Sequence, residues 1–79
     1  MDQQDFHRQL EELFESDPGT VSGKDVLKEI DGWSSLTFLG LIAMLDQEYG
    51  VSLAPATILA CHTVADLQVA VEVGRGKRV

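Results

Sequence analysis

Hydrophobic residues recur at helical spacing in four separate stretches of this chain, and polar residues occupy the positions between them. The patterns predict helices over residues 2–15, 35–50, 55–60 and 64–73. Gly50 suits the end of the second helix, Pro55 the first position of the third, and Thr63 the cap of the fourth. Three longer helices and one short third helix predict an all-α fold, a small four-helix bundle.

A long first loop over residues 16–32 separates the first two predicted helices. Pro18 and Gly19 end the first helix, because both residues break helical hydrogen bonding. A structureless loop of this length is uncommon in a compact domain, so we expect it to lie across the bundle, with one short turn near residues 24–29. Its apolar side chains would then be held against the core: Val21, Val26, Leu27 and Ile30.

The second predicted helix carries two apolar stripes. One lies within an arc of about 100° and suits a core face: Phe38, Leu41, Ile42, Leu45 and Tyr49. The other contains Leu36, Leu39 and Ala43, with Met44 flanking. Because a small protein has little mass to cover both sides, the second stripe is either a partner surface or covered by a neighbouring segment. Gly40 costs about 1 kcal/mol relative to alanine inside a helix, and a close approach by another backbone would explain it.

Composition limits the class of protein. A chain of 79 residues is long enough for one domain, which we predict over residues 1–74, followed by a flexible basic tail over 75–79. One cysteine excludes a disulfide framework, and no apolar run reaches the ~18 residues that a membrane span needs. A net charge of −7 disfavours nucleic acid and anionic membranes as partners. The N-terminus has no basic, apolar leader of the secretory type, so we expect a cytoplasmic protein. We also expect it to be a monomer.

The adjacent Cys61 and His62 suggest a metal site or a thiol nucleophile at first sight. The chain has no second cysteine and His7 is its only other histidine, whereas a metal site needs three or four ligands. A hydrolase that uses Ser35 would lack the Gly-x-Ser-x-Gly turn of that class. We therefore predict neither a metal site nor a catalytic residue.

The segment Gly32-Trp33-Ser34-Ser35-Leu36 precedes the second helix, and Glu48-Tyr49-Gly50-Val51 closes it. One serine can cap the helix, and the other lies in the first turn near the positive end of the helix dipole, which suits a phosphate ester. The stretch resembles the modification site of acyl carrier proteins, many of which have Gly-Trp-Asp-Ser-Leu here. Ser34 stands in place of the aspartate and Ser35 in place of the modified serine, within a resemblance over about residues 26–67.

The resemblance implies an acyl-carrier-like bundle that is not an enzyme. A phosphopantetheinyl transferase would attach 4′-phosphopantetheine from coenzyme A to Ser35. The arm would hold acyl intermediates as thioesters for acyl-loading and acyl-using enzymes, with a high effective concentration. Apolar space between the helices would shelter the acyl chain, lined by Phe38, Ile42, Leu45, Ile58, Leu59 and Val64.

Partner enzymes are expected to bind around the start and along the exposed side of the second helix, at Asp31, Ser34, Leu36, Leu39, Ala43, Met44 and Asp46. Few acids lie near the serine, where the family usually has several. This departure indicates a specialised carrier in a fatty-acid, lipid or polyketide-type pathway. Two alternatives stay open: a peptidyl or aminoacyl carrier, and an unmodified helical module for protein–protein interaction.

Overall fold

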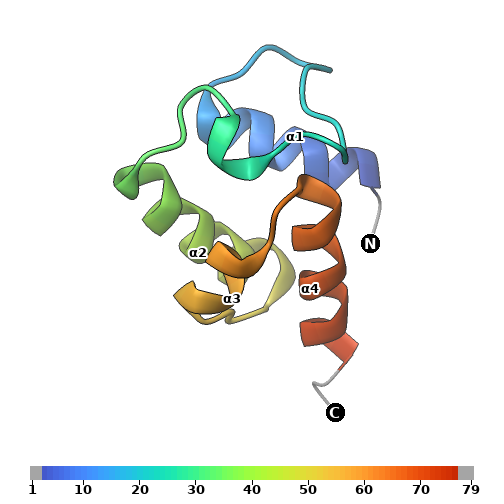
Figure 1. Ribbon diagram of the computed structural model, residues 1–79. Coiled ribbons are helices and arrows are strands. Elements are labelled where there is room, and N and C mark those ends of the chain that lie inside the picture. Colours follow the sequence, from blue (N-terminus) through green and yellow to red (C-terminus); the bar gives the residue numbers. More distant parts are fainter. Residues whose placement is uncertain (1–2, 77–79) are drawn as a thin grey trace.

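The computed structural model describes residues 3–76. Its elements are α1 (Gln3–Phe14), the short 3₁₀ helix η1 (Leu27–Glu29), α2 (Ser35–Tyr49), α3 (Pro55–Ala60) and α4 (Val64–Gly76). In Figure 1, α1 crosses the top of the bundle, and α2 and α4 lie below it on either side. The predicted all-α bundle, with a short third helix and a long first loop, is confirmed. No helix among the described residues is both long and apolar enough to cross a membrane.

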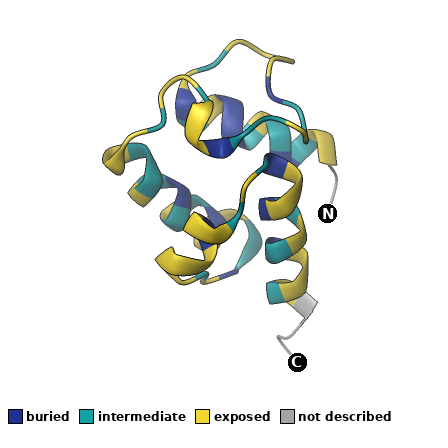
Figure 2. Cartoon of the chain, in the orientation of Figure 1, coloured by how far each residue is buried: buried dark blue, intermediate teal, exposed yellow. Residues whose placement is uncertain are grey.

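The core is formed by the inward faces of the four helices together with residues of the loops. Figure 2 shows buried positions on the inner sides of α1, α2 and α4, and exposed positions on their outer sides. The buried hydrophobic residues are Phe6, Leu10, Phe14, Val21, Leu27, Leu41, Leu45, Val51, Ile58, Val64, Leu67 and Val71. On α2 the predicted core stripe is confirmed, because Phe38, Ile42 and Tyr49 pack half-buried beside the buried Leu41 and Leu45.

The long connection between α1 and α2 lies against the core, as predicted. Val21 and Leu27 are buried in the core, and Ile30 packs half-buried against it. Val26 is half-buried and lines a cavity instead of packing against the core cluster. The predicted turn is η1, which is shorter than the expected 24–29.

Backbone hydrogen bonds join this connection to the start of α4. The Leu27 N–H donates to the His62 carbonyl at 3.0 Å, and the Val64 N–H donates to the Asp25 carbonyl at 2.9 Å. Val26 and Thr63 form a single antiparallel bridge between them. The loop is therefore a fixed part of the bundle, since hydrogen bonds as well as apolar contacts hold it.

A buried carboxylate also ties the connection to α1. Glu11 is 6% exposed, and its Oε2 accepts the backbone N–H of Gly19 at 3.0 Å and that of Val21 at 3.1 Å. These two N–H groups belong to a segment without regular structure, so they have no ladder partner of their own. The sequence pattern did not indicate this role for Glu11.

α4 is longer than the sequence predicted. The helix was expected to end near Val73, with residues 75–79 as a tail, but Arg75 and Gly76 are helical. The guanidinium carbon of Arg75 lies 5.9 Å from the centre of the Tyr49 ring, within the range of a favourable cation–π contact. This contact gives a physical reason for the extra turn. Residues 77–79 of the expected tail lie outside the described residues.

Gly40 allows close packing of α1 against α2. A Cβ placed at Gly40 would lie 2.9 Å from Cδ1 of Leu13. The expected close approach therefore exists, but a side chain of α1 makes it and not a backbone segment. Leu13 occupies the space that a side chain at position 40 would need, which explains why a glycine is present although it lowers helix stability.

Candidate functional site

Ser34 and Thr37 form a reciprocal cap at the start of α2. Ser34 has an extended backbone, and its Oγ accepts the Thr37 N–H at 3.2 Å. The Thr37 hydroxyl oxygen accepts the Ser34 N–H at 2.8 Å. The Thr37 hydroxyl also donates to the Gly32 carbonyl at 2.7 Å. Of the two adjacent serines, Ser34 is therefore the cap.

Ser35 is the first residue of α2 and is exposed to solvent. Within residues 3–76 its hydroxyl makes no hydrogen bond, so the cap does not use it. The first backbone N–H groups of a helix lack intrahelical partners, and the helix dipole makes this end positive. A phosphate ester on the Ser35 oxygen would lie in a favourable field and remain accessible to another protein. These residues thus fit a covalently attached phosphate-containing group.

Trp33 fixes the approach of the chain to Ser34. Its ring centre lies 6.0 Å from that of Phe14 and 5.8 Å from that of Phe38, so it joins α1 to α2. Gly32 has φ +94°, and a Cβ there would lie 2.8 Å from the Phe14 carbonyl oxygen. Only glycine suits this turn, because both the dihedral angle and the close contact exclude a side chain.

The second apolar stripe of α2 is open to solvent. Leu36 is 77% exposed and Leu39 is 63% exposed, and Ala43 is also exposed. Met44 differs from expectation, because it is half-buried and packs against the core. At 100° per residue, Met44 falls between the outer stripe and the core, and its flexible side chain lies inward. Of the residues expected to bind partners, the exposed ones are Asp31, Ser34, Leu36, Leu39, Ala43 and Asp46.

The six residues expected to line an apolar space differ in their burial. Leu45, Ile58 and Val64 are 0–1% exposed and fill the core, whereas Leu59 is 48% exposed. Two cavities within residues 3–76 are lined by other side chains than these six. Five of the six side chains therefore lie in the core or pack against it, and Leu59 lies at the surface.

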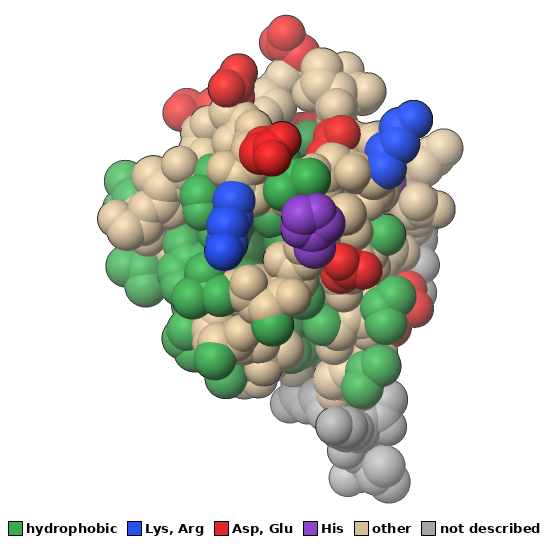
Figure 3. Space-filling model, viewed as in Figure 1, with side chains coloured by type: hydrophobic (Ala, Val, Ile, Leu, Met, Phe, Trp, Pro, Cys, Tyr) green, Lys and Arg blue, Asp and Glu red, His purple; other side chains and the backbone are tan. Residues whose placement is uncertain are grey.

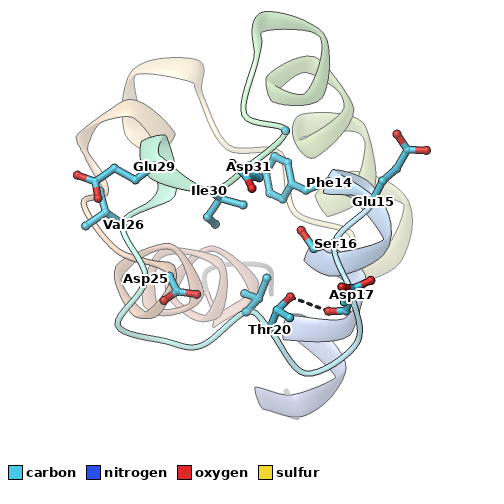
Figure 4. Close-up of a pocket in the computed structure, with 12 residues that line it drawn as sticks. Phe14, Glu15, Ser16, Asp17, Thr20, Asp25, Val26, Glu29, Ile30 and Asp31 are labelled. Carbon is cyan, nitrogen blue, oxygen red and sulfur yellow. Dashed lines mark hydrogen bonds between the residues drawn. The ribbon is translucent and has the colours of Figure 1, made fainter.

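One cavity, of about 600 Å³, lies beneath the long connection and was not predicted from the sequence. Figure 4 shows acidic side chains around it, from the end of α1 and from the loop. The acids that line it are Glu15, Asp17, Asp25, Glu29 and Asp31. The Thr20 hydroxyl donates to the Asp17 carbonyl at 2.6 Å, which closes one side of the loop. Among the residues described, no three His, Cys, Asp or Glu side chains are placed to hold a metal ion.

Cys61 and His62 lie in the short connection between α3 and α4, and both form hydrogen bonds there. The Cys61 thiol donates to the Thr57 carbonyl at 3.3 Å. Burial, and secondly the charge of Asp66, raise the pKa of this thiol, which lowers its reactivity as a nucleophile. Asp66 accepts the N–H groups of His62 and Thr63 at 3.2 and 3.1 Å, and Thr63 Oγ1 accepts the Asp66 N–H. The predicted cap at Thr63 is confirmed.

Comparisons with known proteins agree with this geometry. Residues 9–68 match the family model described as "Phosphopantetheine attachment site". The fold is similar to that of a holo acyl carrier protein from Geobacter metallireducens solved by NMR, with a TM-score of 0.80 and 23% identity. That similarity covers 99% of this chain and 91% of the other. No curated protein matches the chain. Because the family match spans more than half of its residues, the chain belongs to the phosphopantetheine attachment site family of carrier proteins, which bear covalent 4′-phosphopantetheine and are not enzymes.

Proposed function

We propose that Ser35 is the attachment residue and that the chain carries acyl groups on the attached arm. The observation that supports this assignment is the exposed Ser35 hydroxyl at the first position of α2, beside a cap that Ser34 and Thr37 form without it. When bound, 4′-phosphopantetheine supplies a terminal thiol that holds an acyl group as a thioester. Delivery by a tether keeps the acyl group at a high effective concentration for each partner enzyme.

The start of α2 stabilises the phosphodiester in this proposal. Ser35 would supply the ester oxygen, and the positive end of the α2 dipole would stabilise the phosphate charge. A negative charge at this end of a helix is stabilised by about 0.3–1 kcal/mol. The cap residue Ser34 is neutral, so it adds no carboxylate that would repel the phosphate. Trp33, packed between Phe14 and Phe38, holds the whole segment in place.

The proposed pathway is a specialised one, of the fatty-acid, lipid or polyketide type, with the chain acting as a cytoplasmic monomer. The support is the absence of acids along the exposed side of α2 until Asp46. Partner enzymes, including the phosphopantetheinyl transferase, would bind around Ser35 at Asp31, Ser34, Leu36, Leu39, Ala43 and Asp46. Normal, tight use of the chain by a housekeeping ketosynthase would contradict this part of the proposal.

Intact mass spectrometry tests the assignment of Ser35. The full chain is incubated with coenzyme A and a panel of phosphopantetheinyl transferases, beside the variants Ser35→Ala and Ser34→Ala. We expect the wild type and Ser34→Ala to gain the mass of one phosphopantetheine, and Ser35→Ala to gain none. Circular dichroism confirms that both variants are folded. A gain in Ser35→Ala would refute the assignment, and no gain in any protein would support an unmodified interaction module.

A further inference from the structure

Two adjacent serines offer α2 two possible starts. Serine is among the most favourable residues at a helix cap, so residue type alone does not distinguish Ser34 from Ser35. With Ser34 as the cap, Ser35 is the first helical residue and its hydroxyl is exposed. With Ser35 as the cap, the helix would begin one residue later, and Leu36 would hold the first position. The choice of cap therefore determines whether the first position of α2 carries a hydroxyl.

The side chain three residues after the cap distinguishes the two starts. In a capping box this side chain accepts the backbone N–H of the cap residue. Thr37 does so for Ser34, and its hydroxyl oxygen lies 2.8 Å from the Ser34 nitrogen. Phe38 stands at the same place relative to Ser35, but its side chain has no acceptor atom. The Phe38 ring packs against Trp33 instead, with 5.8 Å between the ring centres. Only a start at Ser34 can form the reciprocal cap.

The Thr37 hydroxyl also joins α2 to the turn that precedes it. It donates to the Gly32 carbonyl at 2.7 Å. Gly32 packs closely against the end of α1, because a Cβ at this position would lie 2.8 Å from the Phe14 carbonyl oxygen. One hydroxyl thus bonds both Gly32 and the Ser34 N–H, and it holds the segment directly before Ser35. A helix that began one residue later would lose the reciprocal bond at Ser34.

Hydroxyl groups are the only side chains that can accept a hydrogen bond near this start. No Asp, Glu, Lys or Arg occurs in residues 32–45, and the side chains with an acceptor oxygen in this stretch are Ser34, Ser35 and Thr37. Figure 3 shows several acidic side chains at the top of the molecule and hydrophobic side chains gathered over α2 and α3. With no carboxylate in the stretch to cap the helix, the choice of start depends on the two serines and Thr37.

We propose, resting on the function proposed for Ser35, that Thr37 is a positioning residue for the modification. Its hydroxyl selects Ser34 as the cap and thereby keeps the Ser35 hydroxyl free at the first helical position. In a helix that began one residue later, the Ser35 oxygen would accept the Phe38 N–H and lie over the helix end. A transferase would then meet Leu36 at the first position, where no hydroxyl is present.

Backbone chemical shifts from NMR of the full chain test the choice of cap without any transferase. The wild-type Cα shifts should indicate an extended Ser34 and a helical Ser35. Thr37→Val keeps the shape of the side chain and removes the hydroxyl, so the two serine caps become about equally favourable and the Ser35 shift should move about halfway to its extended value. Thr37→Ser keeps the hydroxyl and should match the wild type. Thr57→Val is the matched control, because Thr57 is exposed on α3, and it should leave the Ser35 shift unchanged.

The rate of modification tests the consequence for Ser35. If half of the molecules have the shifted start, kcat/KM of a transferase for the chain should fall about twofold in Thr37→Val. Ser34→Ala/Thr37→Val also removes the first cap, which favours the start at Ser35 and should lower kcat/KM about fivefold. Thr37→Ser and Thr57→Val should keep the wild-type value. Circular dichroism confirms that each variant is folded.

Other outcomes would overturn the proposal. A Ser35 shift that stays helical in Thr37→Val would show that the hydroxyl does not select the cap, and so would a Thr37→Ser variant that behaves like Thr37→Val. A changed Ser35 shift with an unchanged kcat/KM would show that the cap does not govern modification. In these cases Ser35 is still modified and the proposed function stands. If no transferase modifies the wild-type chain, the proposed function is refuted, and the chemical shifts still decide which serine Thr37 selects as the cap.

Discussion

Replacement of Glu11 by alanine should detach part of the long connection from α1. The Glu11 carboxylate is buried, and its Oε2 accepts the N–H groups of both Gly19 and Val21. Alanine removes the acceptor and leaves two donors without a partner in the protein. Val21 is only 7% exposed, so its N–H has little access to water, whereas Gly19 is exposed and can be hydrated.

The expected loss follows from these two bonds. A hydrogen bond to a charged group contributes about 1.5–3 kcal/mol. With a full loss at Val21 and a partial loss at Gly19, Glu11→Ala should lower the free energy of unfolding by about 3 kcal/mol. At about 0.05–0.15 kcal/mol per residue, the whole domain has about 4–12 kcal/mol, so this is a large fraction.

Urea unfolding followed by circular dichroism measures this loss. Glu11→Gln keeps an oxygen acceptor in the same place and should lose only about 1 kcal/mol. Glu12→Ala is the matched control, because the neighbouring Glu12 is exposed, and it should stay within about 0.5 kcal/mol of the wild type. The reasoning would be refuted if Glu11→Ala were as stable as Glu12→Ala, or if Glu11→Gln were as unstable as Glu11→Ala.

Two further predictions concern helix caps. Ser34→Ala removes the α2 cap and should cost about 1 kcal/mol, or about 4–8 °C in Tm by calorimetry, and an unchanged Tm would contradict the cap. Hydrogen bonds from the backbone N–H groups of Thr63 and His62 lower the pKa of Asp66, so its contribution to stability is present at neutral pH and is lost as the pH falls below about 4. Thermal melts between about pH 7 and pH 3 should therefore show a smaller loss of stability in Asp66→Asn than in the wild type, and equal slopes would contradict this.

The sequence pattern predicted the helices because each of them is amphipathic or carries clear end signals. Gly50 adopts the left-handed conformation and Pro55 opens α3, as expected from residue type alone. A serine cap at the start of α2 was also expected from residue type, and Ser34 is that cap. These features depend only on residues adjacent in the sequence, so they can be predicted from the local sequence pattern.

Features that depend on distant segments could not be predicted in the same way. Glu11 lies on α1 among other acids, and it is buried only because the loop at Val21 folds over it. Met44 turns inward because the core accepts its side chain. The last turn of α4 includes Arg75, which lies over a tyrosine in a different helix. The spacing of apolar and polar residues within one helix does not reveal any of these contacts, because each depends on a segment distant in the sequence.

The position of Trp33 has a practical consequence for the study of this carrier. It is the single tryptophan of the chain, half-buried between two phenylalanines and two residues from Ser35. Indole emission responds to changes in the polarity and order of its surroundings, so one intrinsic fluorophore observes the end of the molecule where Ser35 lies. Events at that end can therefore be followed in solution by fluorescence, with no added label.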